Sequence, residues 1–475
     1  MLSLPGYRPK CAPFWANLSH LLPPVLARGT IRPLRICFFW AGNLVIGTKM
    51  IDEVQSTKLP NGLTILTERM PGLRSVTVGI WVRRGSRHES PELNGICHFI
   101  EHSVFKGTRR RTAQDIAIES DRLGGHLDAY TTHESTGFTM KVADKSLPLA
   151  VDLLADLLAQ PRFDSIDLER EQKVILEEIK MVEDTPDELL AELFNSAYFP
   201  EHALGRPIEG TAETVPTFDQ EITAAFHARE FSPRNLVIAA AGNVDHAVLV
   251  ELVERAFPKG NAEATISSNG KPATAPNSAA PILIEQKEEL EQAHLILATP
   301  WPSSLSNDRY AASMVAAVLG GGTSSRLWQR VREERGLAYS VGAGVSTFSD
   351  IGVFSVYAGT SPSQLDEVLD ISLEELRRVV HERVDEDELR LVKDQAVSST
   401  LLGLESSSAR ASTLARQEII HGRRISPDEM IRRIEAVTVD DMQRVARTYL
   451  VSEDLALGAL GNLNGFRVDR SRLTI

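Results

Sequence analysis

The second half of this sequence repeats the plan of the first. Residues 217–244 (TFDQEITAAFHAREFSPRNLVIAAAGNV) and 438–463 (TVDDMQRVARTYLVSEDLALGALGNL) each have the pattern of an amphipathic helix, a short turn and an apolar strand ending in Gly-Asn-aliphatic. Further in, residues 137–179 and 353–395 share a strand, a turn, a helix, a break and a long charged helix. Such correspondence indicates the duplication of one structural unit, the alternative being a chance likeness of generic patterns.

A linker composition separates the two copies. Residues 258–281 are rich in Pro, Ala, Ser, Gly and Asn and lack periodicity, which divides the body into 50–257 and 282–475. Alternating apolar residues predict strands, and helical segments separate them; the expected strands lie at 63–70, 75–85, 126–142, 293–301 and 352–359. We therefore expect an α+β fold of two homologous lobes, each a mainly antiparallel β-sheet flanked by helices that cover one face.

The first 49 residues differ from the rest because they carry basic side chains and no acidic one. Their apolar run, 36–47, is too short to span a bilayer. Three interpretations stay open: an upstream start codon with Met50 opening the product, a targeting leader, or a folded element. No other segment predicts a membrane helix, so we expect no integral membrane association and a cytoplasmic location, with the mitochondrial matrix or export as alternatives if the leader is genuine.

Composition excludes several classes of function. The net charge of −13 makes nucleic acid an improbable partner and suits a cationic substrate better. The three cysteines form no C-x-x-C pair, which excludes a thiolate zinc knuckle and a disulfide scaffold. The glycine-rich stretch 319–327 (LGGGTSSRL) lacks a following G-K-[ST], so it does not predict a nucleotide site.

One short apolar stretch, 94–108 (NGICHFIEHSVFKGT), contains two histidines and a glutamate. On a helix His98 and His102 are i and i+4, so both imidazoles project from one face, with Glu101 at its edge. Buried polar groups need a compensating partner, and two imidazoles plus a carboxylate make a three-ligand zinc site that keeps one position for water. H-x-x-E-H is the inverted form of a zinc-peptidase motif. The alternative is a hydrogen-bonded pair of core histidines.

The missing carboxylate is expected on a second helix, 167–184 (DLEREQKVILEEIKMVED). Its glutamates are Glu169, Glu171, Glu177, Glu178 and Glu183. Glu171 and Glu178 are i and i+7 and share a face, whereas Glu177 lies about 100° away from Glu178. From the residues alone, each of these glutamates is equally compatible with a solvated helix surface.

Together, residues 95–108 (GICHFIEHSVFKGT) and 169–179 (EREQKVILEEI) resemble the pitrilysin/insulinase family of zinc peptidases. Within that family, the chain is most similar to the mitochondrial processing peptidase β-subunit and its bacterial relatives. The resemblance runs from about residue 55 to the C-terminus and includes the duplicated halves.

The resemblance implies roles for individual residues. His98, His102 and Glu178 would bind one Zn²⁺ per chain, and Glu178 stands at the family's distance from the second histidine. Glu101 would be the general base. Glu171, seven residues before Glu178, would support the metal site without binding the metal directly.

Two further segments match the family. In 330–341 (RVREERGLAYSV), Arg332 and Tyr339 match a pair that reaches the active site from the C-terminal lobe, where both can donate hydrogen bonds to developing negative charge. On their own they are compatible with an ordinary helix end and strand.

The stretch 124–138 (GGHLDAYTTHESTGF) resembles the family's substrate-binding edge strand, which would pair with an extended peptide. An ordinary strand start is the alternative. The residues that this assigns to substrate binding are Asp128, Ala129, Tyr130 and Thr131. Relatives commonly carry Asn where this chain has Asp128, which leaves detailed specificity open.

The resemblance implies a zinc-dependent endopeptidase that acts on unfolded peptides or presequence-like segments. The main alternative is a non-catalytic or structural subunit of a processing-peptidase-like or respiratory-core-like complex; a third is a binding or quality-control module without cleavage. The expected partners are a peptide or unfolded polypeptide substrate and a second subunit, either in a homodimer or in a heterodimer with an inactive homologue.

Overall fold

The computed structural model describes residues 54–257 and 276–475. The predicted leader, 1–49, and most of the predicted linker lie outside the described residues. Within those residues no helix is both long and apolar enough to cross a membrane. The predicted lobe boundaries at residues 257 and 282 remain predictions.

The first sheet has six strands in the order β1-β2-β6-β3-β5-β4. All neighbouring strands are antiparallel except β2 and β6. The strands are β1 (Val54–Lys58), β2 (Thr64–Arg69), β3 (Ser75–Val82), β4 (His126–Thr131), β5 (Thr136–Ala143) and β6 (Leu236–Gly242). The stretch predicted as strand from 126 to 142 is thus a hairpin, β4–β5, with its turn at residues 132–135.

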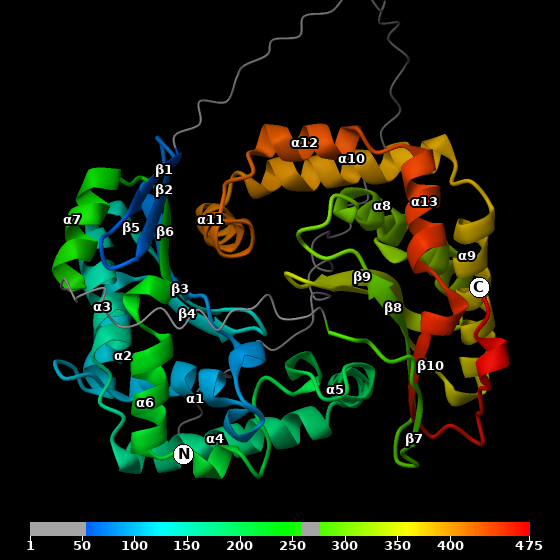
Figure 1. Cartoon of the computed structure of the whole chain (residues 1–475), viewed down its shortest axis with the longest axis horizontal. Helices are drawn as coiled ribbons and strands as arrows, with labels where there is room; N and C mark the ends of the chain where they lie inside the picture. Colours follow the sequence, from blue (N-terminus) through cyan, green and yellow to red (C-terminus); the bar gives the residue numbers. More distant parts are fainter. Residues whose placement is uncertain (1–53, 258–275) are drawn as a thin grey trace, which may run out of the picture. The chain divides into compact units, whose positions relative to one another are not determined.

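The second sheet has five strands in the order β7-β11-β8-β10-β9. Only β7 and β11 are parallel. The strands are β7 (Ile282–Gln286), β8 (Ala293–Trp301), β9 (Ala338–Thr347), β10 (Gly352–Thr360) and β11 (Ala456–Gly461). Each sheet receives its last strand in sequence, β6 or β11, between earlier ones, so the predicted α+β fold with two similar, mainly antiparallel sheets is confirmed (Figure 1).

The helices of the two halves correspond in part. In the first half they are α1 (Ile96–Ser103), α2 (Ala113–Leu123), α3 (Leu147–Ala159), α4 (Ser165–Glu183), α5 (Pro186–Tyr198), α6 (Gln220–Glu230) and α7 (His246–Ala256). In the second half they are α8 (Arg309–Gly320), α9 (Leu365–His381), α10 (Glu386–Gly403), α11 (Ser407–His421), α12 (Pro427–Glu435) and α13 (Val439–Tyr449). The pair α4–α5 corresponds to α10–α11.

Each sheet is covered on a second face by a helix from the other half. On β6, Ile238 and Ala240 belong to the core with α3 and α7, whereas Val237 and Ala239 pack with Leu414 of α11 on the opposite face. The prediction that helices cover only one face was therefore incomplete.

The exchange is reciprocal, because α5 packs against β8 and β11 of the second sheet. A side chain at Gly458 in β11 would place its Cβ 2.8 Å from the ring of Phe194 in α5, so glycine at this position allows the close approach of the helix.

One histidine of α6 is expected to make stability pH-dependent. The ring of His227 packs against Phe163 and Phe231, and its Nε2 is buried without a partner among the described residues. Burial lowers the pKa of His227 to about 4, although a backbone hydrogen bond to Leu158 opposes the shift. Because the unfolded chain binds this proton from about pH 6.5 downward, the His227 contribution to stability falls as the pH drops from 6.5 to 4.

We expect the parent to lose about 2 kcal/mol more stability than His227→Leu between pH 7.5 and pH 5. Urea unfolding of both proteins at the two pH values measures this difference. Equal pH dependence in the two proteins would contradict the assignment.

Candidate metal centre

The N-terminus of α1 is fixed by a buried carboxylate. Glu89, 5% exposed, accepts hydrogen bonds from the backbone N–H groups of Gly95 and Cys97, both at 2.8 Å. Gly95 has φ +97°, and a Cβ there would lie 2.6 Å from the carbonyl oxygen of Glu209, so this position requires glycine. These contacts set the direction in which α1 enters the core.

Three candidate ligands converge on one point. His98 and His102 lie one turn apart on α1, and Glu178 faces them from α4. Oε2 of Glu178 is 3.9 Å from Nε2 of His98 and 3.7 Å from Nε2 of His102. Ligand atoms about 2.0–2.1 Å from a tetrahedral zinc ion lie roughly 3.3–3.5 Å apart. The two carboxylate–imidazole distances are slightly longer than this, and the three ligand atoms all lie within 4.8 Å of one another. Glu177, by contrast, is 70% exposed and pairs with Lys180.

The protonation of His98 suits metal binding. His98 is 5% exposed, and burial together with the charge of His102 lowers its pKa to about 3, so the imidazole is neutral at pH 7. Metal ions bind the neutral imidazole and the ionised carboxylate. Two nitrogens and one oxygen therefore fit a zinc ion held by His98, His102 and Glu178, with room in its coordination for water.

Behind the ligands, Glu171 and Lys106 form a chain of contacts. Oε2 of Glu171 lies 3.3 Å from Nδ1 of His102, and Oε1 lies 2.7 Å from Nζ of Lys106. Burial raises the pKa of Glu171, but these two partners outweigh it and lower the pKa overall. At His102 burial lowers the pKa, but the hydrogen bond to Glu171 and the charges of nearby carboxylates outweigh burial and raise the pKa overall. A carboxylate on the remote nitrogen of a ligating histidine fixes the tautomer and the ring orientation.

Glu101 lies beside the ligands with its carboxylate held by a hydroxyl. Its side chain is buried, at 8% exposure, and Oγ1 of Thr131 donates a hydrogen bond of 2.6 Å to its Oε2. Burial raises the pKa of Glu101 to about 7, although Thr131 and His102 oppose the shift. A carboxyl group with such a pKa can both accept and donate a proton near neutral pH.

Strand β4, which contains the four residues assigned to substrate, forms one edge of the first sheet. It pairs with β5, and no strand of the described residues pairs with its other side. The hydroxyl of Tyr130 accepts a hydrogen bond from Nε1 of Trp81, whereas Thr131 contacts Glu101. The edge of β4 therefore ends next to Glu101, the candidate general base.

Three further carboxylates form a cluster that reaches Glu178 through Glu209. Glu209 is 8% exposed, while Glu188 and Glu192, one turn apart on α5, are half-buried. Burial, followed by repulsion from Glu209 and Glu188, raises the pKa of Glu192 to about 7. Burial and the charge of Glu209 also raise the pKa of Glu178. None of the three forms an ion pair within the described part of the chain.

The structure places Arg332 and Tyr339 together. Arg332 belongs to a π-helix, Trp328–Glu333, and its guanidinium lies 4.6 Å from the ring centre of Tyr339 and donates a 2.8 Å hydrogen bond to the Tyr339 carbonyl. Tyr339 is 80% exposed. Across the described residues no hydrogen bond or ion pair joins either side chain to His98, His102 or Glu178. Their role at the site remains a prediction.

Known families match both halves of the sequence. Residues 64–212 match the insulinase domain of peptidase family M16, and residues 218–396 match the M16 inactive domain. An uncharacterized zinc protease of Streptomyces coelicolor is 42% identical over 412 residues, which cover 86% of this chain and 89% of the relative. The chain belongs to the insulinase family of peptidases.

Other matches agree with this family. An uncharacterized zinc protease of Bacillus subtilis is 36% identical over 400 residues, covering 84% of this chain and 96% of the relative. Among solved structures, a Helicobacter pylori protease has a TM-score of 0.79 at 22% identity and covers 86% of this chain and 99% of its own. A chain of Candida albicans complex III2 has a TM-score of 0.76 at 23% identity, covering 89% of this chain and 100% of its own. These two likenesses show the fold alone, and the resemblance to the insulinase family is confirmed.

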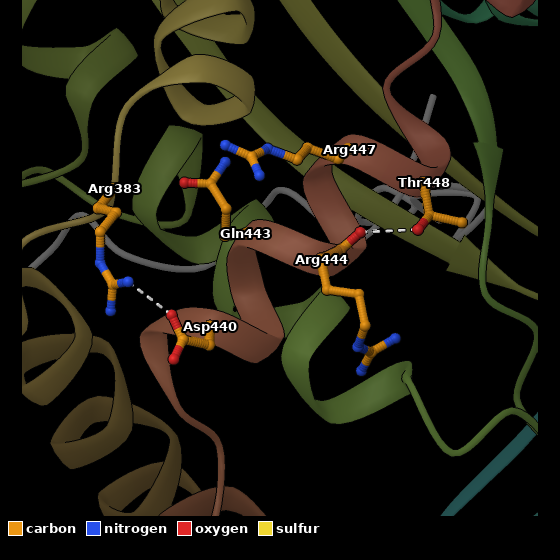
Figure 2. Close-up of a pocket in the computed structure, with 6 residues that line it drawn as sticks. All are labelled: Arg383, Asp440, Gln443, Arg444, Arg447 and Thr448. Atoms are coloured by element: carbon orange, nitrogen blue, oxygen red, sulfur yellow. Dashed lines mark hydrogen bonds and ion pairs between the residues drawn. The ribbon is translucent and has the colours of Figure 1, made fainter.

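A surface hollow of this insulinase-family chain includes none of the candidate metal ligands and has no unpaired side chain suited to metal binding. It has a volume of about 440 Å³ and is lined by Arg383, Asp440, Gln443, Arg444, Arg447 and Thr448 (Figure 2). Arg383 pairs with Asp440 at 2.7 Å, and Arg444 pairs with Asp308 at 2.9 Å. No histidine, cysteine or unpaired carboxylate lines it, so the chemistry of this family member is expected at α1 and α4.

Sequence reasoning missed several residues at or near the candidate metal centre. Lys106 stands four residues after His102, at a spacing that already predicts a neighbouring position. The i, i+4 pair Glu188 and Glu192 was also visible. Glu209 gave no local signal, because a loop and not a helix brings it to the site.

Proposed function

We propose that this member of the insulinase family is a zinc-dependent endopeptidase that hydrolyses peptide bonds in unfolded, basic polypeptides. The convergence of His98, His102 and Glu178 beside the buried Glu101 carries the proposal. One Zn²⁺ per chain is expected, since within the described residues this is the one group of three such side chains that can hold a metal ion. When bound, zinc supplies the polarisation of the scissile carbonyl and the acidification of water.

The chain's own residues transfer the proton, orient the candidate ligands and bind the peptide. Glu101 accepts the proton of the attacking water and returns it to the leaving amine. Glu171 orients His102 through Nδ1, and Lys106 neutralises the buried Glu171 carboxylate. The edge of β4 with which no strand of the described residues pairs binds the backbone of an extended peptide and places it alongside Glu101. Backbone pairing requires an unfolded substrate and tolerates many sequences.

The acidic cluster of Glu188, Glu192 and Glu209 favours a basic substrate. We expect the double variant Glu188→Gln, Glu192→Gln to lose roughly tenfold in kcat/KM on an arginine-containing peptide, the order expected when a charged partner worth about 1.5 kcal/mol is lost. The same variant should change little on a peptide in which the arginines are replaced by glutamine. Steady-state assays of both peptides with parent and variant measure this. Equal losses on the two peptides would exclude charge recognition by this pair.

The direct test uses the full chain and a quenched basic peptide of about 20 residues. The expected result is cleavage that a chelator abolishes and stoichiometric zinc restores, with metal analysis giving about one zinc per chain. Bound zinc without cleavage of any of several unfolded substrates would reject the endopeptidase. Absence of zinc binding would reject the metal centre itself.

A second candidate is a non-catalytic subunit, and the fold likeness to a chain of complex III2 is the observation that favours it. A structural subunit needs neither a converged ligand set nor a buried carboxylate beside it, so both features favour the enzyme. We propose in addition that the chain acts as a homodimer, or pairs with an inactive homologue; light scattering of the active fraction measures the assembly.

A further inference from the structure

One side chain holds the carboxylate of Glu101. The hydroxyl of Thr131 donates a hydrogen bond of 2.6 Å to Oε2, and no other side chain of the described residues forms a hydrogen bond to this carboxylate. Glu101 is buried at 8% exposure, so the contact is largely shielded from water. The orientation of the carboxylate therefore depends on a single partner.

Thr131 is well suited to hold it. As a β-branched residue in a strand, threonine has few accessible rotamers, so its hydroxyl has a defined direction. The backbone next to it is fixed on two sides: the N–H of Thr132 donates to the Ser135 carbonyl at 2.8 Å, and the N–H of Ser86 donates to the Thr132 carbonyl at 3.1 Å. The hydroxyl is thus attached to a rigid strand end.

A carboxylate that acts as a base must present one oxygen to the proton and keep the other from rotating away. The bond from Thr131 occupies Oε2 and leaves Oε1 for the reaction. Precise positioning of a reacting group by a neighbouring side chain changes the rate much more than the binding of substrate.

We propose that Thr131 is the positioning residue of Glu101 and, as the last residue of the edge strand β4, couples the docking of a peptide along that edge to the orientation of the base. The inference rests on the proposed endopeptidase function. It assigns to Thr131 a role through its side chain, whereas the sequence assigned it to substrate binding.

The test compares Thr131→Val, which removes the hydroxyl with little change of shape, with Thr131→Ser, which retains it. Thr139→Val is the matched control, because Thr139 lies in the paired strand β5 and its hydroxyl forms no hydrogen bond with another described residue. We expect Thr131→Val to lower kcat at least tenfold with KM within twofold of the parent and zinc content unchanged. Thr131→Ser should restore most of kcat, and Thr139→Val should match the parent.

A kcat equal to that of the parent in Thr131→Val would overturn the proposal. So would a raised KM with unchanged kcat, which would instead make Thr131 a substrate contact. Crystal structures of zinc-loaded parent and Thr131→Val give a readout without turnover: Glu101 should hold one orientation in the parent and several in the variant. An inactive parent would reject the endopeptidase, whereas a single Glu101 orientation in both structures would reject the role of Thr131 alone.

Discussion

Glu101→Gln is expected to abolish peptide-bond hydrolysis while the protein retains its zinc. The amide has nearly the shape of the carboxylate and can still accept the hydrogen bond from Thr131, but it cannot take a proton from water. Loss of a general base lowers rates by about 10²- to 10⁴-fold. His98, His102 and Glu178 are unchanged in the variant, so metal analysis should still give about one zinc per chain.

Glu177→Gln is the matched control, because Glu177 lies on the neighbouring helix and is 70% exposed. It should have the activity and zinc content of the parent. Turnover of Glu101→Gln within threefold of the parent would remove Glu101 from the mechanism, and loss of zinc from that variant would indicate a structural role instead.

Arg87→Met is expected to cost about 3 kcal/mol of stability, the lower end for breaking a buried ion pair, because it leaves two half-buried carboxylates without their cation. The side chain of Arg87 is 8% exposed and forms ion pairs of 2.6 Å with both Glu134, in the β4–β5 turn, and Asp350, in the β9–β10 turn. Glu134 also accepts hydrogen bonds from the N–H and the hydroxyl of Ser349. Arg87 therefore joins two hairpin turns from opposite halves of the sequence.

The comparison for this variant is Arg390→Met, which breaks an ion pair with Asp387 in which the side chains are 72% and 77% exposed. Exposed pairs contribute about 0–1 kcal/mol, so this variant should unfold at nearly the urea concentration of the parent. A loss of stability in Arg87→Met no larger than that in Arg390→Met would show that the pairing of the two turns contributes little.

The convergence of the candidate ligands was largely predictable because its signals are short-range. The i, i+4 spacing of His98 and His102 fixes their common face wherever α1 lies, and the i, i+7 spacing of Glu171 and Glu178 does the same on α4. Which glutamate binds metal was open from spacing alone and depended on the family resemblance. The structure now brings Glu178 to the histidines and Glu171 to the far side of His102.

Other features could not be predicted because they depend on contacts between distant segments. The pairing of Thr131 with Glu101 requires the edge strand to end beside α1, and no periodicity encodes that. Helices α5 and α11, which each pack on the sheet of the other half, have the apolar pattern of any amphipathic helix. That pattern does not indicate which sheet the helix covers. Arg332 lies in a π-helix and Tyr339 in the strand that follows it, but their relation to the candidate metal centre depends on tertiary packing that spacing does not specify.

The reciprocal packing of α5 and α11 bears on how such a chain can have arisen. Two identical protomers that trade one helix across a twofold axis form a swapped dimer, and each then depends on the other to close its sheet. Joining two such protomers end to end gives the connectivity seen here, with α4–α5 and α10–α11 as the traded arms. In a fused pair one copy can keep the metal ligands while the other loses them without penalty to folding. The second half, which carries no H-x-x-E-H motif, is in that position.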